Sequence, residues 1–320
     1  MSSAVGDADH GRVSAFKPAN PSPRENFLRP GVPFCGSEAV AAGLVTAYEL
    51  RSRFRRLFPD VYIEVTCAVT PQILVRAASL WAPAGAVISG AGAALLHRER
   101  WYSPEMVLRA SDVYCSIARR TPPGVRIRRH VGEFPPGHLV EKAGILCTSA
   151  GRTAVDVGRW EKSDDIAIAK IDAVCNRSRI KVDSLSATVD QMPGLHGVNR
   201  IRSLLSWCDE RADSPPETRL RLMLIRAGLP VPTPQLVIRN EYGEKIAKAD
   251  LGYEAQKVAI FYDSEMHREK STWEFDAWAN AQMAELGWER FRVTAPMMRS
   301  PVTLTRQIGS AVMRGSWPGS

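Results

Sequence analysis

The sequence has no long apolar run, no paired cysteine motif and no apolar N-terminal stretch. No apolar run approaches the ~18 residues that would indicate a membrane-spanning helix. The opening residues, MSSAVGDADHGRVSAF, lack the apolar stretch of a signal peptide. The six cysteines lie at least 28 residues apart, so there is no C-x-x-C motif for zinc or redox chemistry. We therefore expect a cytoplasmic protein with free thiols and no membrane partner.

The composition is that of a globular protein with a basic surplus. The 320 residues include 42 Lys and Arg against 34 Asp and Glu, a formal net charge of +8, and 45% are hydrophobic. This balance excludes a disordered chain and supplies enough apolar mass for about two domains at roughly 150 residues each. The surplus of positive charge suits a polyanionic partner such as DNA.

The order of patterns along the chain predicts a multi-domain α/β (α+β) protein in four segments. Residues 1–33 carry Ser, Gly, Pro and charges without any period and predict a flexible arm. We expect a winged helix-turn-helix over 34–70 and a mixed α/β region over 71–210. The cluster Asp-Ser-Pro-Pro then marks the start of a last domain, 211–320.

The winged helix-turn-helix is predicted from two short helices and a strand. Ser37 to Ala42 predicts a helix that stops at Gly43, and Thr46 with Glu49 three residues later forms the capping box of a second helix. After Pro59 the alternating segment VYIEV predicts a strand. A helix, a glycine turn, a basic helix and a strand follow one another in winged helix-turn-helix domains.

Two arginine clusters are candidate nucleic-acid-binding surfaces. The functional interpretation places the second helix in a DNA major groove with arginines on phosphates; the alternative is a basic face that is merely solvated. In the middle region, 72–97 has a helical pattern broken near Pro83, and strand-like runs follow. Two arginines of one such run share a strand face. The candidates are Arg51, Arg53, Arg55 and Arg56 in the first cluster and Arg126 and Arg128 in the second.

The last domain has the predicted element order αβββαβα. The predicted elements are a helix over 217–227, strands over 234–240, 245–253 and 256–263, a helix over 272–286, a strand over 288–294 and a helix over 302–313. Glu217 lies in the first turn of the first helix, Asp250 near the end of the second strand, and Asp263 at the end of the third.

Carboxylates gathered from a helix and two strand ends suit a hard divalent cation. Mg²⁺ takes oxygen ligands, and it can polarise a phosphodiester and deliver water. His267 is a candidate general acid or base, and Arg292 on the last strand is a candidate for neutralising a phosphate. The alternative is that these are ordinary surface residues, because acidic residues at strand ends and an exposed His are common.

Several consecutive blocks of this region resemble a known family. The blocks are SPPETRLRLMLIRAGLPVPTPQ, KADLGY, KVAIFYDSEMH and WEFDAWANAQMAELGWERFRVT. Over about 212–300 they resemble the Vsr-like branch of the PD-(D/E)XK nuclease superfamily, which implies a restriction-endonuclease-like fold. The residues that fit the family text are Asp250, Tyr262, Asp263, His267, Asp276, Gly287, Trp288 and Arg292.

Two positions depart from the family text. Phe261 stands where the family has a strand acid two residues before Asp263, and Ser264 stands where it has a glycine. Residues 261 and 263 face the same side of a strand, so the phenylalanine removes a metal ligand and adds apolar bulk.

The front half resembles the helix-turn-helix region of AbiEi-type antitoxin relatives that precede this nuclease-like domain in actinobacterial proteins. The segments are SEAVAAGLVTAYELRSRFRRLFPDVYI, TSAGRTAVDVGR and GLHGVNRIRSLLSWCDERADSPPETR. The resemblance implies DNA binding in front of a nuclease fold, with a toxin-like protein as a possible partner.

Three functions remain open from the sequence. The first is a Mg²⁺-dependent DNA endonuclease, with Asp250 and Asp263 as metal ligands, Glu217 orienting the metal or its water, and His267 as acid or base. The second is a catalytically inactive DNA-binding regulator or antitoxin-like protein, which Phe261 favours. The third is a protein-interaction module that binds no nucleic acid.

Overall fold

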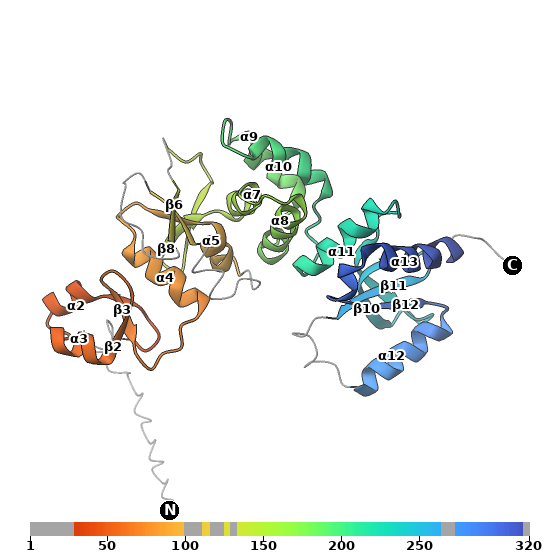
Figure 1. Ribbon diagram of the computed structural model, residues 1–320, viewed down its shortest axis with the longest axis horizontal. Coiled ribbons are helices and arrows are strands. Elements are labelled where there is room, and N and C mark those ends of the chain that lie inside the picture. Colours follow the sequence, from red (N-terminus) through yellow and green to blue (C-terminus); the bar gives the residue numbers. More distant parts are fainter. Residues whose placement is uncertain (1–28, 99–110, 116–124, 129–132, 264–272, 316–320) are drawn as a thin grey trace, which may run out of the picture. The chain divides into compact units, whose positions relative to one another are not determined.

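The computed structural model describes residues 29–98, 111–115, 125–128, 133–263 and 273–315 (Figure 1). These residues fall into two compact units, Met1–Ala68 and Val69–Ser320. The arm expected over 1–33 lies almost wholly outside the described residues. The domain boundary predicted near residue 210 lies inside the second unit.

The first unit combines two short helices with a small sheet. Its elements are β1 (Phe34–Cys35), α2 (Gly36–Ala41), α3 (Ala47–Arg53), β2 (Phe54–Phe58) and β3 (Val61–Glu64). The strands are antiparallel in the order β1-β3-β2, so β2 and β3 form a hairpin next to α3. The predicted helix–turn–helix–strand order is therefore present.

Local chemistry fixes the two helices as the sequence predicts. Gly43 has a φ of 67°, which a glycine adopts without strain, and it ends the turn after α2. The Thr46 hydroxyl accepts a hydrogen bond from the Glu49 amide at 3.1 Å, and the Glu49 carboxylate accepts one from the Thr46 amide at 2.8 Å. The predicted capping box is confirmed.

One part of the first unit differs from the sequence expectation. The basic helix ends at Arg53, and Arg55 and Arg56 lie on strand β2. Phe54 ends the helix because its extended backbone carries its ring into the core of the unit, where it meets Phe34 edge to face at 5.0 Å. The tertiary packing of Phe54 thus ends α3 at Arg53 and places the residues that follow on a strand.

The second unit begins with a five-stranded sheet and a set of helices. The strands are ordered β6-β5-β4-β8-β7. The elements are α4 (Pro71–Trp81), β4 (Val87–Ser89), α5 (Gly90–Leu96), β5 (Ser111–Tyr114), β6 (Val125–Arg128), β7 (Leu139–Lys142), β8 (Ile145–Thr148), α7 (Ala150–Arg159), α8 (Asp164–Ser178), η1 (Val182–Ser184), α9 (Leu185–Asp190), α10 (Val198–Leu204) and η2 (Leu205–Trp207).

The helical pattern expected over 72–97 is wrong at its centre. Val87–Ser89 forms strand β4, which pairs antiparallel with β5 and parallel with β8. All three residues are buried, and a short continuous apolar run cannot be assigned to helix or strand by periodicity alone. Strand β6 lies within a predicted strand-like run, and β5 spans the junction of two such runs, whereas the β7–β8 hairpin was not predicted.

The remainder of the second unit confirms the predicted order αβββαβα. The elements are α11 (Pro215–Arg226), β9 (Thr233–Arg239), β10 (Lys245–Tyr253), β11 (Val258–Asp263), α12 (Trp273–Glu285), β12 (Glu289–Thr294), η4 (Met297–Arg299) and α13 (Pro301–Gly315). The strands are ordered β12-β11-β10-β9, with β11 and β12 parallel and the other pairs antiparallel.

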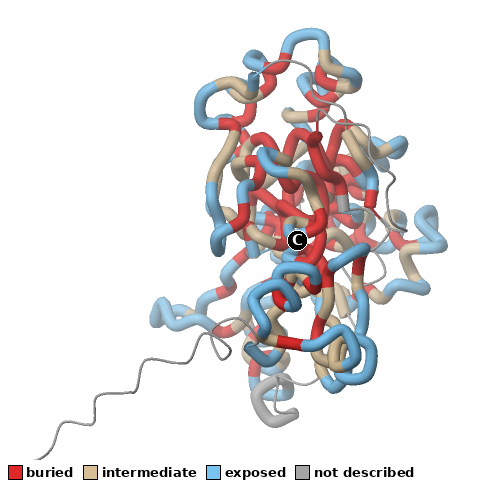
Figure 2. Tube along the Cα trace, turned by 90° about the vertical axis from the view of Figure 1, so that its left-hand side faces the viewer, coloured by how far each residue is buried: buried red, intermediate tan, exposed pale blue. Residues whose placement is uncertain are grey.

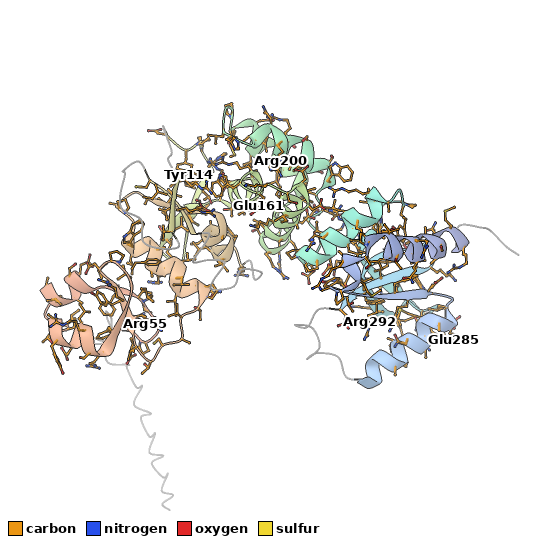
Figure 3. The ribbon with its side chains drawn as sticks, in the orientation of Figure 1. Arg55, Tyr114, Glu161, Arg200, Glu285 and Arg292 are labelled. Carbon is orange, nitrogen blue, oxygen red and sulfur yellow. The ribbon has the colours of Figure 1, made fainter. Side chains whose placement is uncertain are left out.

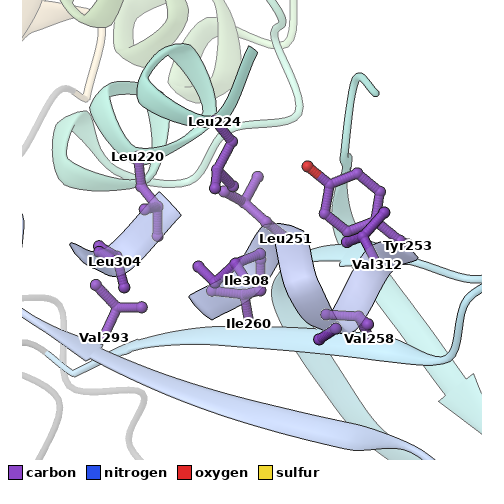
Figure 4. Close-up of a cluster of buried hydrophobic side chains, with 11 residues drawn as sticks. Leu220, Leu224, Leu251, Tyr253, Val258, Ile260, Val293, Leu304, Ile308 and Val312 are labelled. Atoms are coloured by element: carbon purple, nitrogen blue, oxygen red, sulfur yellow. The ribbon is translucent and has the colours of Figure 1, made fainter. Parts of the chain in front are cut away.

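Two apolar clusters cover the two faces of this sheet. The α11/α13 core joins Leu220 and Leu224 of α11 and Leu304 and Ile308 of α13 to strand residues that include Ile260 (Figure 4). The α12 core lies on the other face and is formed by Leu236, Ile238, Ile246, Ala249, Ala259, Ala279 and Met283. The sheet is therefore covered by helices on both faces, and exposed turns surround the buried segments (Figure 2). In the described part of the chain, no helix combines the length and the hydropathy needed to span a bilayer.

The capping box gives a test of the first unit. Replacing Thr46 by Ala removes the side-chain acceptor of the Glu49 amide, and we expect the unit to lose about 1 kcal/mol of unfolding free energy. Chemical denaturation, with amide hydrogen exchange to locate the loss, measures this. The exposed Thr66 is a matched control whose replacement by Ala should change little. Equal stability of the two variants would contradict the prediction.

Candidate functional site

A buried carboxyl group stands at the start of α11. Glu217 is 5% exposed, in the first turn of a helix that begins with Ser214 as cap and two prolines. Its Oε1 accepts a hydrogen bond from the Ser214 hydroxyl at 2.6 Å. Its Oε2 accepts from the Asp213 amide at 3.1 Å and from Nε2 of Gln235 at 2.7 Å. Donors from the helix start and from strand β9 thus hold this carboxyl group.

Asp250, on strand β10, lies close enough to Glu217 of α11 for its charge to act on that carboxyl group. Its Oδ2 accepts a hydrogen bond from the Tyr262 amide of β11 at 2.6 Å, beyond the last paired residues of the β10–β11 ladder. Burial, followed by the negative charge of Asp250, raises the pKa of Glu217 to about 7. The structure therefore brings Glu217 and Asp250 together, and the pair shares a site in which one carboxyl group exchanges its proton near neutral pH.

Asp263, the last residue of β11, pairs with Arg292 of β12. Nη1 of Arg292 lies 3.9 Å from Oδ2 of Asp263, and the two side chains are 52% and 20% exposed, respectively. A guanidinium group at this distance from the carboxylate opposes the approach of a cation.

Phe261, at the position where the family resemblance implies an acid, packs against the α12 core. The guanidinium carbon of Arg290 lies 5.9 Å from the centre of its ring. The ring therefore takes part in the packing of the sheet face and supplies no ligand.

Within the described ranges, no group of three or more His, Cys, Asp or Glu side chains could hold a metal ion. His267 lies outside those ranges. The assignment of Asp250 and Asp263 as metal ligands, and of Glu217 and His267 as catalytic groups, stays a prediction.

The arginines of the first unit are exposed along α3 and β2. Nη1 of Arg53 lies 3.6 Å from Oε1 of Glu49. Nη2 of Arg55, which is labelled in Figure 3, donates to the Cys67 carbonyl at 2.8 Å. Arg51 and Arg56 are exposed, and no ion pair or hydrogen bond with another described residue involves their side chains.

The second arginine cluster is tied to a buried acid. Asp112 on β5 is 2% exposed and lies between Arg126, at 3.2 Å, and Arg128, at 2.7 Å. Arg128 also lies over the Trp160 ring at 4.1 Å. These contacts assign Arg128 a structural role, while Arg126, 53% exposed, keeps the more accessible head group.

Sequence reasoning missed a buried charged network on α7. Asp156 is fully buried and accepts hydrogen bonds from Nε of Arg152 at 2.9 Å and Nε of Arg159 at 2.7 Å. The Tyr114 hydroxyl donates to the same carboxylate at 3.0 Å, and Arg152 contacts His138 at 3.2 Å. The spacing R-x-x-x-D-x-x-R in GRTAVDVGR, which puts the three side chains on one helix face, was the available signal.

A second missed cluster joins α8 to α11. Asp172 on α8 is 1% exposed and accepts hydrogen bonds from the Thr218 hydroxyl at 2.9 Å, from Arg221 at 3.0 Å and from the Asp209 amide at 2.8 Å. Burial raises the pKa of Asp172 to about 7, and the charge of Arg221 opposes that rise. The helix that carries Glu217 is thus attached to the preceding region through one carboxylate.

The fold and the site define a mixed α/β protein with three sheets among its described residues. Two curated proteins of Mycobacterium tuberculosis are similar to it, MT2308 of strain CDC 1551 / Oshkosh and Rv2248 of strain ATCC 25618 / H37Rv, both described as uncharacterized. Each is 30% identical over 210 residues, which cover 62% of this chain and 74% of the relative. The chain belongs to the family of these two proteins. No family model matches the sequence, and no solved structure matches the chain.

The pKa of Glu217 predicts how stability depends on pH. Because this pKa is about 7 in the folded chain against 4.5 when unperturbed, the folded state keeps a proton that the unfolded state releases. Stability from this group is highest below pH 4.5 and falls, by about 3 kcal/mol, as pH rises to 7. Glu217→Gln should remove this fall.

The measurement is the difference in unfolding free energy between Glu217→Gln and the unchanged protein at several pH values. We expect the variant to gain relative stability from pH 4.5 to pH 7. The exposed Glu254→Gln, in the turn between β10 and β11, is the control and should show a flat difference. A flat difference for Glu217→Gln as well would show that this carboxyl group titrates normally.

Proposed function

We propose that this chain is a DNA-binding protein that uses its first unit to contact the duplex. The observation that carries the proposal is the run of exposed arginines along α3 and β2, on a helix fixed by its capping box. Helix α3 enters the major groove, and the arginines bind phosphates on either side of it.

Most of these arginines have weak intramolecular contacts or none to other described residues, which leaves them available to a polyanionic ligand. Arg51 and Arg56 are exposed, and among the described residues neither head group has a hydrogen bond or ion pair that DNA binding would have to break. The pair between Arg53 and Glu49 is exposed and long, and such surface pairs contribute only about 0–1 kcal/mol. A phosphate can therefore compete for three of the four guanidinium groups, while Arg55 keeps its hydrogen bond to the Cys67 carbonyl.

Salt dependence tests this proposal. Each phosphate contact adds about 0.9 to the slope of log affinity against log salt concentration, so the double variant Arg51→Ala/Arg56→Ala should reduce the slope by about 2 and weaken binding. Binding of fluorescent duplex DNA across a salt series gives both quantities. Arg306→Ala, at an exposed position of α13, is the control. Equal affinity and slope in the double variant would remove the first unit as the DNA-binding surface.

The C-terminal region supports a second candidate function, Mg²⁺-dependent hydrolysis of a DNA phosphodiester. The observation that favours it is the burial of the Glu217 carboxyl group beside Asp250. Mg²⁺ commonly uses one or two protein carboxylates together with water and phosphate oxygens, so Asp250 and Asp263 are sufficient in kind. When bound, the ion would polarise the phosphodiester and lower the pKa of water.

The chain's own residues have distinct tasks in this second function. Glu217 orients the attacking water and takes its proton, since its pKa lies close to neutral. Arg292 neutralises a phosphate of the substrate. Phe261 replaces the third carboxylate that the family has on this strand, and its presence weakens the reaction. If Phe261 abolishes the reaction, the protein is a DNA-binding regulator or antitoxin-like protein. An antitoxin-like protein would bind a toxin-like protein as its partner.

Two substitutions separate hydrolysis from regulation. We expect weak nicking of supercoiled DNA with Mg²⁺ or Mn²⁺, a loss of about 100-fold or more in Asp250→Ala, and a gain in Phe261→Glu, which restores an oxygen ligand. Gel analysis of plasmid DNA measures all three. The absence of cleavage in both the unchanged protein and Phe261→Glu would eliminate hydrolysis and leave DNA binding as the function.

A further inference from the structure

Gln235 has an unusual backbone for a strand residue. Its φ is 55°, in the left-handed region, although it lies within β9 and has a long side chain. A non-glycine residue held in this region is strained, because its Cβ comes too close to the backbone. Such strain persists only when the surrounding structure holds it in place, and it is often found at functional sites.

Strand β10 is irregular at the residue opposite Gln235. The ladder pairs Ala249 with Leu236 and Leu251 with Pro234, which leaves Asp250 opposite Gln235. Ala249 belongs to the α12 core and Leu251 to the α11/α13 core, although residues two apart on a regular strand share a face. The alternation of side chains between the two faces of the sheet is therefore interrupted at Asp250, which lies opposite the strained Gln235.

The side chain of Gln235 bridges the sheet and helix α11. Its Nε2 donates to Oε2 of Glu217 at 2.7 Å, while the other donors to that carboxyl group, the Ser214 hydroxyl and the Asp213 amide, come from the start of the helix itself. Without Gln235, these contacts would still fix Glu217 relative to α11, but its hydrogen bond to the sheet would be lost.

We propose that Gln235 is a positioning residue that holds the carboxyl group of Glu217 against Asp250. A catalytic effect of this positioning rests on the second candidate function, the hydrolysis of DNA. Gln235 acts through Glu217 and does not touch the substrate. The left-handed backbone of Gln235 directs its side-chain amide towards α11, and the side chain is long enough to reach Glu217.

The choice of amino acid supports this role. Glycine adopts a φ of 55° without strain, and asparagine tolerates it better than most residues. Either residue would relieve the backbone of β9, but glycine has no amide and asparagine is one methylene shorter. The residue present is the one that reaches Glu217.

The test is a comparison of Gln235→Gly in two backgrounds, with Glu217 intact and with Glu217→Gln. The amide of Gln235 stabilises the ionised carboxylate, so with Glu217 intact the variant should lose stability relative to the unchanged protein as pH rises from 4 to 8. The midpoint of the Glu217 titration should move upward by about one pH unit. With Glu217→Gln the effect of Gln235→Gly should not depend on pH, and relief of the strained φ should make the variant more stable. Denaturant unfolding across pH gives these values.

Two further variants sharpen the comparison. Gln235→Asn should behave as Gln235→Gly, because its amide falls short of Glu217. Lys257→Gly is the matched control: Lys257 also has a positive φ, 53°, but lies in the turn before β11, where Nζ binds the Leu286 carbonyl. Its replacement should show no change with pH. A pH-independent effect of Gln235→Gly with Glu217 intact would overturn the proposal.

The outcome for hydrolysis is separate. If the unchanged protein and Phe261→Glu cleave no DNA while the pH-dependent effect of Gln235→Gly is present, Gln235 still positions Glu217 and only the hydrolase function fails. If cleavage occurs but Gln235→Gly leaves its rate and pH profile unchanged, hydrolysis stands and the positioning role is rejected.

Discussion

The arrangement of the C-terminal region depends on a carboxyl group that is buried beside a second one. Glu217 is almost fully buried and lies within the influence of the negative charge of Asp250, two conditions that both favour its protonated form. Three donors compensate for the loss of water, and each comes from a feature that serves this purpose: the serine cap of α11, the backbone before it, and a glutamine on a strained strand position. An apolar side chain at this position would make the core more stable, so stability alone does not explain a carboxyl group there.

The two candidate functions place different demands on the molecule. DNA binding needs exposed guanidinium groups on a rigid helix and hairpin, and the first unit has both. Hydrolysis needs carboxylate oxygens that converge on an ion, and there Phe261 and the pair between Asp263 and Arg292 work against a strong site. The second unit thus has some of the acids that the proposed hydrolysis needs, next to a sheet face packed with apolar side chains.

Much of the architecture could be predicted from local signals in the sequence. Caps and glycines mark the helices: the Thr46–Glu49 box, the prolines before Glu217, and Gly287, whose φ of 78° ends α12. Alternation and turn residues also placed β9 to β12. Strand β2 was missed because the packing of Phe54 ends the helix before it, and β4 because it pairs with distant strands. The two buried networks were missed because Tyr114 lies 42 positions from Asp156, and the partners of Asp172 lie 37 to 49 positions from it. The conformation of Gln235 has no sequence signal, since glutamine carries no preference for a positive φ.

The attachment of α11 to α8 has a consequence for how the chain can be divided. Asp172 takes hydrogen bonds from the linker before α11 and from Thr218 and Arg221 on that helix. A fragment cut at the natural-looking Asp-Ser-Pro-Pro sequence would leave the Arg221 guanidinium without its carboxylate and would expose the apolar surface that α8 covers. The segment from α11 to α13 is therefore not a module that can be excised at its sequence border, and a well-folded fragment has to retain helix α8 as well.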